Sequence, residues 1–244
     1  MRGDAIGRRI SVLAIGLGAL ALAAQARDDK HKVEIASTET ISFESGGRIR
    51  ISNSIGEVKV EGWDRPEVEV TVIRATNRDY APQNQAAARR DLEDVTVRVV
   101  KESREKLRIE TVFPKRDLFS PFRGKTNVHV RYRIKAPANT SLWIDHEVGE
   151  VDVSGVKADI EIRNRIGEVN VKLPRGAYRA NAKVRLGEVN SDLLGTSRRR
   201  FLSHEFVSDE RQDGRRLLLR VGIGEINVRC EGGREEKGSP ERII

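Results

Sequence analysis

Apolar and polar residues alternate along most of the chain after residue 32, with the period of two that indicates β-strands. Glycine pairs and a Trp-Asp-Arg-Pro segment at 63–66 interrupt the alternation as turns. Alternating segments occupy 38–43, 48–53, 56–61, 68–74, 94–100, 106–113 and 125–135. The alanine-rich segment within 82–94 is the one convincing helix. The pattern therefore predicts an all-β protein with one short helix inserted in its N-terminal half.

A short phrase, apolar-Gly-Glu-apolar, occurs five times, at 55–58, 148–151, 166–169, 186–189 and 223–226. Its glycines and glutamates are Gly56, Glu57, Gly149, Glu150, Gly167, Glu168, Gly187, Glu188, Gly224 and Glu225. From Gly149 onward the glycines are 18, 20 and 37 residues apart. The last gap suggests a degenerate unit between two repeats, and Gly56 is expected to lie outside the regular array.

Each repeat has a simple physical interpretation. Glycine permits a positive φ, and therefore a tight corner between two short strands. The segments 158–163 and 178–184 are expected to be the return strands. One such unit cannot bury its own apolar face, whereas stacked units can. We therefore expect a solenoid-like stack, of the single-stranded right-handed β-helix type, with strands about 4.8 Å apart.

Stacking would align polar side chains in two columns on the surface. One column holds the glutamates that follow the glycines, and the other holds Asp152, Asn170, Asn190 and Asn227. Because carboxylates at this spacing repel, cationic neighbours are needed, and Arg163, Arg165, Arg185 and Lys172 are candidates. A ladder of stacked amides is the favoured interpretation. A calcium site is the alternative, although no acidic loop of calcium-binding spacing occurs.

The first 26 residues have the pattern of a cleavable signal peptide. Arg2, Arg8 and Arg9 precede an uncharged apolar run at 10–24, and a small-x-small cleavage pattern ends at Ala26. An uncleaved anchor is the alternative. Residues 27–231 then form one β domain, with the repeats at 141–231, and 232–244 is a mobile tail. Localisation in the periplasm or at the cell surface follows.

Charge and cysteine content narrow the choice of partner. The 244 residues carry a formal net charge of +8, which cleavage of the leader lowers to +6 by removing three Arg and one Asp. A basic surface favours anionic partners, and export argues against nucleic acid. Cys230 is the single cysteine, so no disulfide forms within the chain. Strand alternation favours a small core residue, and pairing with a cysteine of another molecule is the alternative.

The order of these motifs resembles the putative-adhesin family of bacterial envelope proteins. The resemblance rests on Gly56-Glu57-Val58-Lys59-Val60-Glu61-Gly62-Trp63-Asp64, on Tyr132-Arg133-Ile134-Lys135-Ala136-Pro137 and on the Gly-Glu-Val repeats, and it covers about 41–230. It implies an all-β, solenoid-like stack without an established enzymatic activity and with no catalytic residues to transfer. Many family members have Ser-Gly-Asp where this chain has Ile-Gly-Glu or Val-Gly-Glu.

No catalytic constellation is evident. The four histidines, His31, His129, His146 and His204, lack metal-ligand spacing, and no nucleophile elbow or phosphate-binding glycine loop occurs. We therefore expect a non-enzymatic envelope binding or scaffold protein that needs no cofactor. Its partner would be an anionic glycan, a lipid or a protein, with Arg198, Arg199 and Arg200 as the candidate contact. The alternatives are a glycan-active enzyme on a β-solenoid and a structural protein that self-associates through its stack ends.

Overall fold

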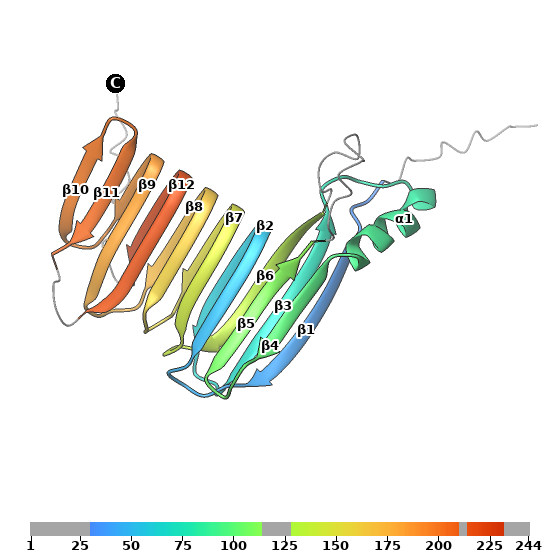
Figure 1. Ribbon diagram of the computed structural model, residues 1–244, viewed down its shortest axis with the longest axis horizontal. Coiled ribbons are helices and arrows are strands. Elements are labelled where there is room, and N and C mark those ends of the chain that lie inside the picture. The colour runs from blue at the N-terminus through green and yellow to red at the C-terminus, as the bar shows by residue number, and fades with distance from the viewer. Residues whose placement is uncertain (1–29, 114–127, 210–213, 232–244) are drawn as a thin grey trace, which may run out of the picture.

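The computed structural model describes residues 30–113, 128–209 and 214–231, so the predicted signal peptide and tail lie outside the described residues. The described chain forms one sheet of twelve strands with one helix (Figure 1). The N-terminal elements are β1 (Glu34–Ser42), β2 (Arg48–Trp63), β3 (Glu67–Thr76), α1 (Pro82–Glu93), β4 (Thr96–Lys101), β5 (Lys106–Val112) and β6 (Val128–Pro137). The later elements are β7 (Ser141–Ser154), β8 (Ile160–Leu173), β9 (Tyr178–Ser191), β10 (Gly195–Arg200), β11 (Ser203–Ser208) and β12 (Arg215–Cys230). This arrangement confirms the expected all-β stack with one short helix.

The repeats form long bent strands. In β2, β7, β8, β9 and β12 the glycine of the repeat has a φ between +129° and +139°, a range that favours glycine, and the strand turns a corner there. We call the part before the glycine the first arm and the part after it the second arm. Side chains from both arms meet in the core, as Ile160 and Ile162 do with Val169 and Val171 in β8. The two short strands predicted for each repeat are these two arms.

The order of the stack departs from the order of the chain. The bent strands are parallel and in register, and they lie in the order β2-β7-β8-β12-β9. Gly56 pairs with Gly149, so the expectation that it lies outside the array is wrong. The last repeat, β12, lies between β8 and β9 and pairs with both.

The expectation of a degenerate repeat between β9 and β12 is also wrong. The segment 195–208 forms an antiparallel hairpin, β10–β11, that pairs with β9 and ends the stack. It has no Gly-Glu corner, and its two strands are joined by the two-residue turn Phe201-Leu202, so it folds back on itself instead of bending.

At the other end, the sheet divides around β2. The first arm of β2 pairs with β5, and its second arm pairs with β6, while β7 covers the whole of its opposite edge. β6, β3 and β1 then continue as antiparallel strands. Helix α1 begins at Pro82 and buries Ala88 and Leu92 beside β1 and β3. No helix among the described residues is long and apolar enough to cross a membrane.

Candidate functional site

Inside the corners, polar side chains bind the backbone of the neighbouring strand. The amide of Asn164 donates a hydrogen bond to the carbonyl oxygen of Gly149 at 2.9 Å. In the adjacent strands the same inner position is held by His146, whose Nε2 lies 3.1 Å from the Gly56 oxygen, and by Asn53, whose amide donates to Val130 O at 3.3 Å. All three side chains are buried. Because a buried carbonyl without a partner is costly, these side chains stabilise the corners.

On the outer surface of the second arms, the two predicted polar columns are present. Asn170 donates from Nδ2 to Glu150 Oε1 at 3.0 Å and to Asp152 Oδ1 at 3.1 Å. Asn227 repeats the pattern with Glu168 at 2.9 Å and Asn170 at 3.0 Å. Asn190 repeats it again with Glu225 at 2.7 Å and Asn227 at 3.0 Å. Each amide therefore joins one glutamate to the next member of its own column, and we call this arrangement the amide ladder.

The amide ladder carries more carboxylates than cations, although Lys59, Lys172 and Arg229 line a hollow of about 740 Å³ beside it, with Lys59 opposite Asp152. Burial, followed by the charges of Asp152, Glu168 and Glu57, raises the pKa of Glu150, and the hydrogen bond from Asn170 opposes this. Of the cations expected beside the glutamates, Arg163 pairs instead with Glu161 at 3.0 Å. The ion pair in the columns is formed by Arg199 and Glu188 at 2.9 Å. No group of three or more His, Cys, Asp or Glu in the described chain is arranged to hold a metal ion.

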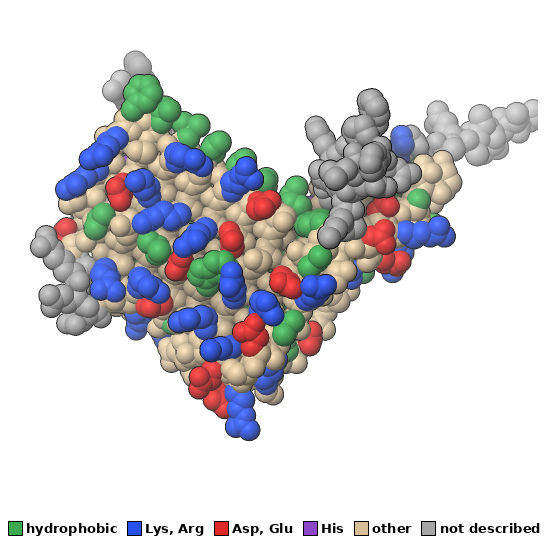
Figure 2. Space-filling model, viewed as in Figure 1, with side chains coloured by type: hydrophobic (Ala, Val, Ile, Leu, Met, Phe, Trp, Pro, Cys, Tyr) green, Lys and Arg blue, Asp and Glu red, His purple; other side chains and the backbone are tan. Residues whose placement is uncertain are grey.

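The outer surface of the first arms is basic from β8 to β10, whereas in β7 the same rows hold Asp145, opposite Arg163, and Glu147. Cross-strand pairing places one row of side chains side by side in β8, β12, β9, β11 and β10. This row is Arg163, Arg220, Lys183, Glu205 and Arg198. A second row, one step nearer the corners, contributes Arg165, Arg185 and Arg200. We call these two rows the basic face, and Figure 2 shows Lys and Arg side chains gathered over these strands.

The basic face concentrates like charges at neighbouring positions. Its two rows hold seven Lys or Arg and one Glu. Arg163, Arg220 and Lys183 are direct cross-strand neighbours, an arrangement that is destabilising in a sheet. Burial lowers the pKa of Arg220. The charge of Glu205 acts against this shift, and the charge of Arg163 adds to it. The fold itself does not require this clustering.

An apolar row runs along the corners, between the basic face and the amide ladder. It consists of the residue before each glycine: Ile55, Val148, Ile166, Ile223 and Leu186, paired strand to strand in that order. The last four are 39% to 46% exposed. His204 pairs with Val184 in antiparallel register, so Leu202, two residues earlier, lies level with Leu186. Phe201 follows at the tip of the β10–β11 turn. We call these seven residues the apolar ridge; Figure 2 shows a row of hydrophobic side chains along this edge.

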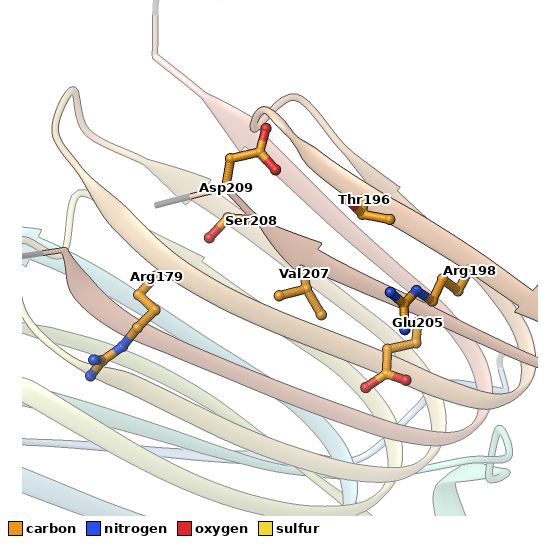
Figure 3. Close-up of a pocket in the computed structure, with 7 residues that line it drawn as sticks. All are labelled: Arg179, Thr196, Arg198, Glu205, Val207, Ser208 and Asp209. Atoms are coloured by element: carbon orange, nitrogen blue, oxygen red, sulfur yellow. The ribbon is translucent and has the colours of Figure 1, made fainter. Parts of the chain in front are cut away.

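A hollow of about 440 Å³ lies at the end of the basic face, lined by Arg179, Thr196, Arg198, Glu205, Val207, Ser208 and Asp209 (Figure 3). Ser208 is already engaged, since its hydroxyl donates to Tyr178 O at 3.0 Å and accepts from the Ala180 N–H at 2.8 Å. Arg198 lies opposite Glu205 across the β10–β11 pair. The hollow therefore presents charged groups to solvent, and its hydroxyl serves the backbone.

The three arginines predicted as one contact are divided by strand alternation. Arg198 and Arg200 lie on the basic face, on the same side of β10 as Thr196. Arg199 lies on the opposite side, where it pairs with Glu188. The structure thus brings Arg198 and Arg200 together with Arg165 and Arg185, which sequence reasoning had assigned to the glutamate columns.

The closest approach to catalytic geometry is a Ser–His pair in the terminal hairpin. Ser197 Oγ lies 2.6 Å from His204 Nε2. His204 Nδ1 accepts the Val189 backbone N–H at 2.9 Å, which fixes the proton of the neutral ring on Nε2. The ring therefore donates to Ser197 and has no free lone pair with which to remove the serine proton, as a general base must.

Two further residues, Cys230 and Trp143, bear on the surface. Cys230 is half-buried at the end of β12, so it is less enclosed than the expected core residue, and burial together with Asp192 raises its pKa. Trp143 lies on the first-arm surface, where the Arg50 guanidinium stacks on its ring at 3.9 Å from the centroid. This contact covers one face of the ring that would otherwise be open to a sugar.

Comparisons with known proteins yield distant structural matches and no family. No protein-family model matches the chain, and no curated protein matches it. Among solved structures, a putative cell adhesion protein from Clostridium sporogenes matches at 12% identity with a TM-score of 0.43, covering 80% of this chain and all of that one. A putative adhesin from Bacteroides fragilis matches at 11% identity with a TM-score of 0.25, covering 80% of this chain and 97% of that one. At these values neither structure bears on the ligand or activity of this chain.

Proposed function

We propose that this protein is an exported, non-catalytic binding module of the bacterial cell envelope, of adhesin-like type, which recognises an anionic partner through its basic face. One observation carries the proposal: over the five adjacent strands β8, β12, β9, β11 and β10, two neighbouring rows hold seven Lys or Arg side chains and a single Glu. Asp145 and Glu147 of β7 mark the edge of this face. Like charges at cross-strand neighbours destabilise the free protein, and an anionic partner relieves that repulsion.

The pairing of these side chains supports the same proposal. Within the described chain, Arg165, Lys183, Arg185, Arg198 and Arg200 have no side-chain hydrogen bond or ion pair. Arg165, Lys183 and Arg185 stand on the parallel strands β8 and β9, and Arg198 and Arg200 stand on the antiparallel hairpin that ends the stack. Backbone pairing therefore sets the spacing of their Cα atoms before a partner arrives. A preorganised set of cations loses little conformational freedom on binding.

The proposal is tested by co-sedimentation of the purified protein with cell-envelope fractions at low and high salt. We expect binding that weakens with salt, because contacts between exposed charges are screened. Changing Arg165, Arg185 and Arg200 together to Gln should weaken binding by about fivefold for each charge removed. The matched control changes Lys59, Lys172 and Arg229 to Gln on the second-arm side, which likewise removes three positive charges and should leave binding intact.

If the control variant also lost binding, the loss would be explained by net charge, and the proposal that binding uses the basic face would be contradicted. Binding that is independent of salt would contradict an anionic partner.

Cleavage of envelope glycans receives less support from the geometry. Glu205 and Asp209 in the hollow are four residues apart on an extended segment, about 13 Å, whereas paired glycosidase carboxylates lie roughly 5 to 10 Å apart.

A further inference from the structure

The apolar ridge is an exposed feature that the fold does not need. The core of each bent strand is completed by inward side chains such as Ile162 and Val169, while Ile166 between them projects outward. Polar residues at the ridge positions would leave that core unchanged. An uninterrupted row of exposed Val, Ile and Leu at a strand spacing of about 4.8 Å is therefore a candidate interaction surface.

The ridge ends in a conformationally strained, fully exposed aromatic residue. Phe201 is 99% exposed and has a φ of +35°. Left-handed backbone favours Gly or Asn, so Phe at this turn position costs about 1 to 2 kcal/mol. The side chain recovers none of this cost by packing within the described protein. Strain retained without an internal contact points to a contact outside the molecule.

Basic side chains border the ridge on one side. Arg165, Arg185 and Arg200 occupy the row next to it, and the remaining cations of the basic face follow. On the other side lie the glutamates of the amide ladder, of which Glu188 is paired with Arg199. From β8 onward the ridge thus separates a basic surface from an acidic surface, and in β7 the residue beside it on the first-arm side is Glu147. An anionic plane would attract the first and repel the second, which defines one orientation of the molecule.

From this juxtaposition we propose that the anionic partner is a lipid bilayer surface, with the basic face lying against acidic headgroups and Phe201 and the apolar ridge inserted at the headgroup–acyl boundary. The proposal rests on the function proposed above and names its partner. Apolar side chains flanked by Arg and Lys are the combination by which peripheral proteins bind anionic membranes. A soluble polyanion would satisfy the arginines and leave Phe201 and the ridge in water.

The test uses the purified protein with vesicles of phosphatidylcholine containing phosphatidylglycerol, with vesicles of phosphatidylcholine alone, and with soluble polyphosphate. Phe201→Asn removes the apolar group and suits the left-handed backbone, so the variant should fold at least as stably as the wild type. We expect its affinity for the anionic vesicles to fall about tenfold, in line with partial burial of one Phe side chain. Its affinity for polyphosphate should be unchanged.

Leu194→Asn is the matched control. Leu194 is 84% exposed and lies in the turn before β10, at the opposite end of that strand from Phe201. The variant removes a similar apolar group away from the ridge and should bind vesicles as the wild type does. A second pair of variants, Phe201→Trp and Leu194→Trp, reports depth: brominated acyl chains should quench the added fluorescence of the first variant and not that of the second.

The outcomes separate this proposal from the function on which it rests. Tenfold loss in Phe201→Asn together with quenching in Phe201→Trp supports insertion. Salt-sensitive vesicle binding with neither effect overturns insertion and leaves an anionic-surface module. Binding to envelope fractions but to neither kind of vesicle overturns the lipid partner alone. Absence of binding to envelope fractions, vesicles and polyphosphate overturns both proposals.

Discussion

The carbonyl oxygen of Gly149 occupies the space that a side chain on Gly167 would need. An ideal Cβ at position 167 would lie 1.9 Å from that oxygen, far inside van der Waals contact. Gly224 has the same relationship to Gly167, and Gly187 to Gly224, each at 1.8 Å. The corners therefore pack backbone against backbone, and each glycine meets two demands, a positive φ and absence of a side chain.

Gly167→Ala is expected to lower the free energy of unfolding by about 4 kcal/mol or more, since backbone strain and a clash with backbone add together. The matched control is Gly46→Ala, whose φ is +87° but whose Cβ would meet nothing within 4 Å. It should cost only about 1 to 2 kcal/mol. Urea denaturation of the two variants measures the difference. Equal costs would show that the clash is absorbed by a shift of the neighbouring strand.

Asn227→Asp should destabilise the stack by about 2 to 3 kcal/mol at neutral pH. The change removes two hydrogen bonds donated to Glu168 and Asn170 and places a carboxylate beside carboxylates. Asn227→Ala, the control, loses the hydrogen bonds without adding charge and should cost about 1 kcal/mol. Denaturation at neutral and acid pH distinguishes the two variants. The added deficit of the Asp variant should disappear in acid, and a deficit that persists would argue against charge repulsion.

His146 should make the protein less stable as pH falls through the mildly acid range. Burial lowers the pKa of His146, and the carbonyl oxygens of Asn53 and Gly56, which face its two ring nitrogens, act in the opposite direction. The unfolded chain therefore takes up the proton first, near pH 6.5. The free energy of unfolding should decline from about pH 6.5 downward until the lower pKa of the folded state is reached.

His146→Asn provides the check, because Asn occupies the equivalent inner position in both neighbouring strands. The variant should keep a hydrogen bond to the Gly56 oxygen and lose part of the acid dependence when unfolding is measured from about pH 8 to pH 5. His129, whose pKa is also lowered by burial, should supply the remainder. An unchanged pH profile would show that His146 does not titrate in this range.

Tyr132 should ionise well above the usual range of a phenol and should limit stability in alkali. Burial raises its pKa to about 12, although the hydrogen bond with Thr111, at 2.6 Å between hydroxyl oxygens, acts in the opposite direction. Because the unfolded phenol ionises near pH 10, stability should be lost as pH rises from about 10 to about 12. Ultraviolet difference titration follows the ionisation. Ionisation of this tyrosine near pH 10 would contradict the burial of its hydroxyl.

Much of the fold could be predicted from local pattern, because the residues of each repeat determine its own backbone geometry. Glycine followed by Glu and alternating valines specifies a corner and a second arm wherever it occurs, as at Gly167 and Gly149. The neighbours of a strand are not a local property. The alternation of β12 would fit beside any of the other bent strands equally well. Its place between β8 and β9 therefore depends on the length and path of the hairpin that precedes it. The same reasoning explains why Gly56 joins the stack despite its distance along the chain.

The candidate site was less accessible to sequence reasoning. The run Arg198–Arg200 stands out in the sequence, but strand alternation places Arg199 with Glu188 and the other two on the basic face. A signal for the apolar ridge was present: Val148 and Val151 are both apolar and three positions apart, so strict alternation cannot bury both. Which of them faces solvent depends on the direction of the bend at Gly149.

The insertion of β12 between β8 and β9 also governs how the C-terminal half can form. Until residues 215–230 are in place, no strand connects β8 to β9 and the hairpin that pairs with β9. The edges of β8 and β9 that β12 will cover are then unpaired. Growth of the stack therefore cannot follow synthesis one repeat at a time, as it would in a solenoid wound in chain order. The final strand completes two interfaces in one step, which predicts cooperative folding with high contact order and a chain vulnerable to strand exchange between copies before that step is complete.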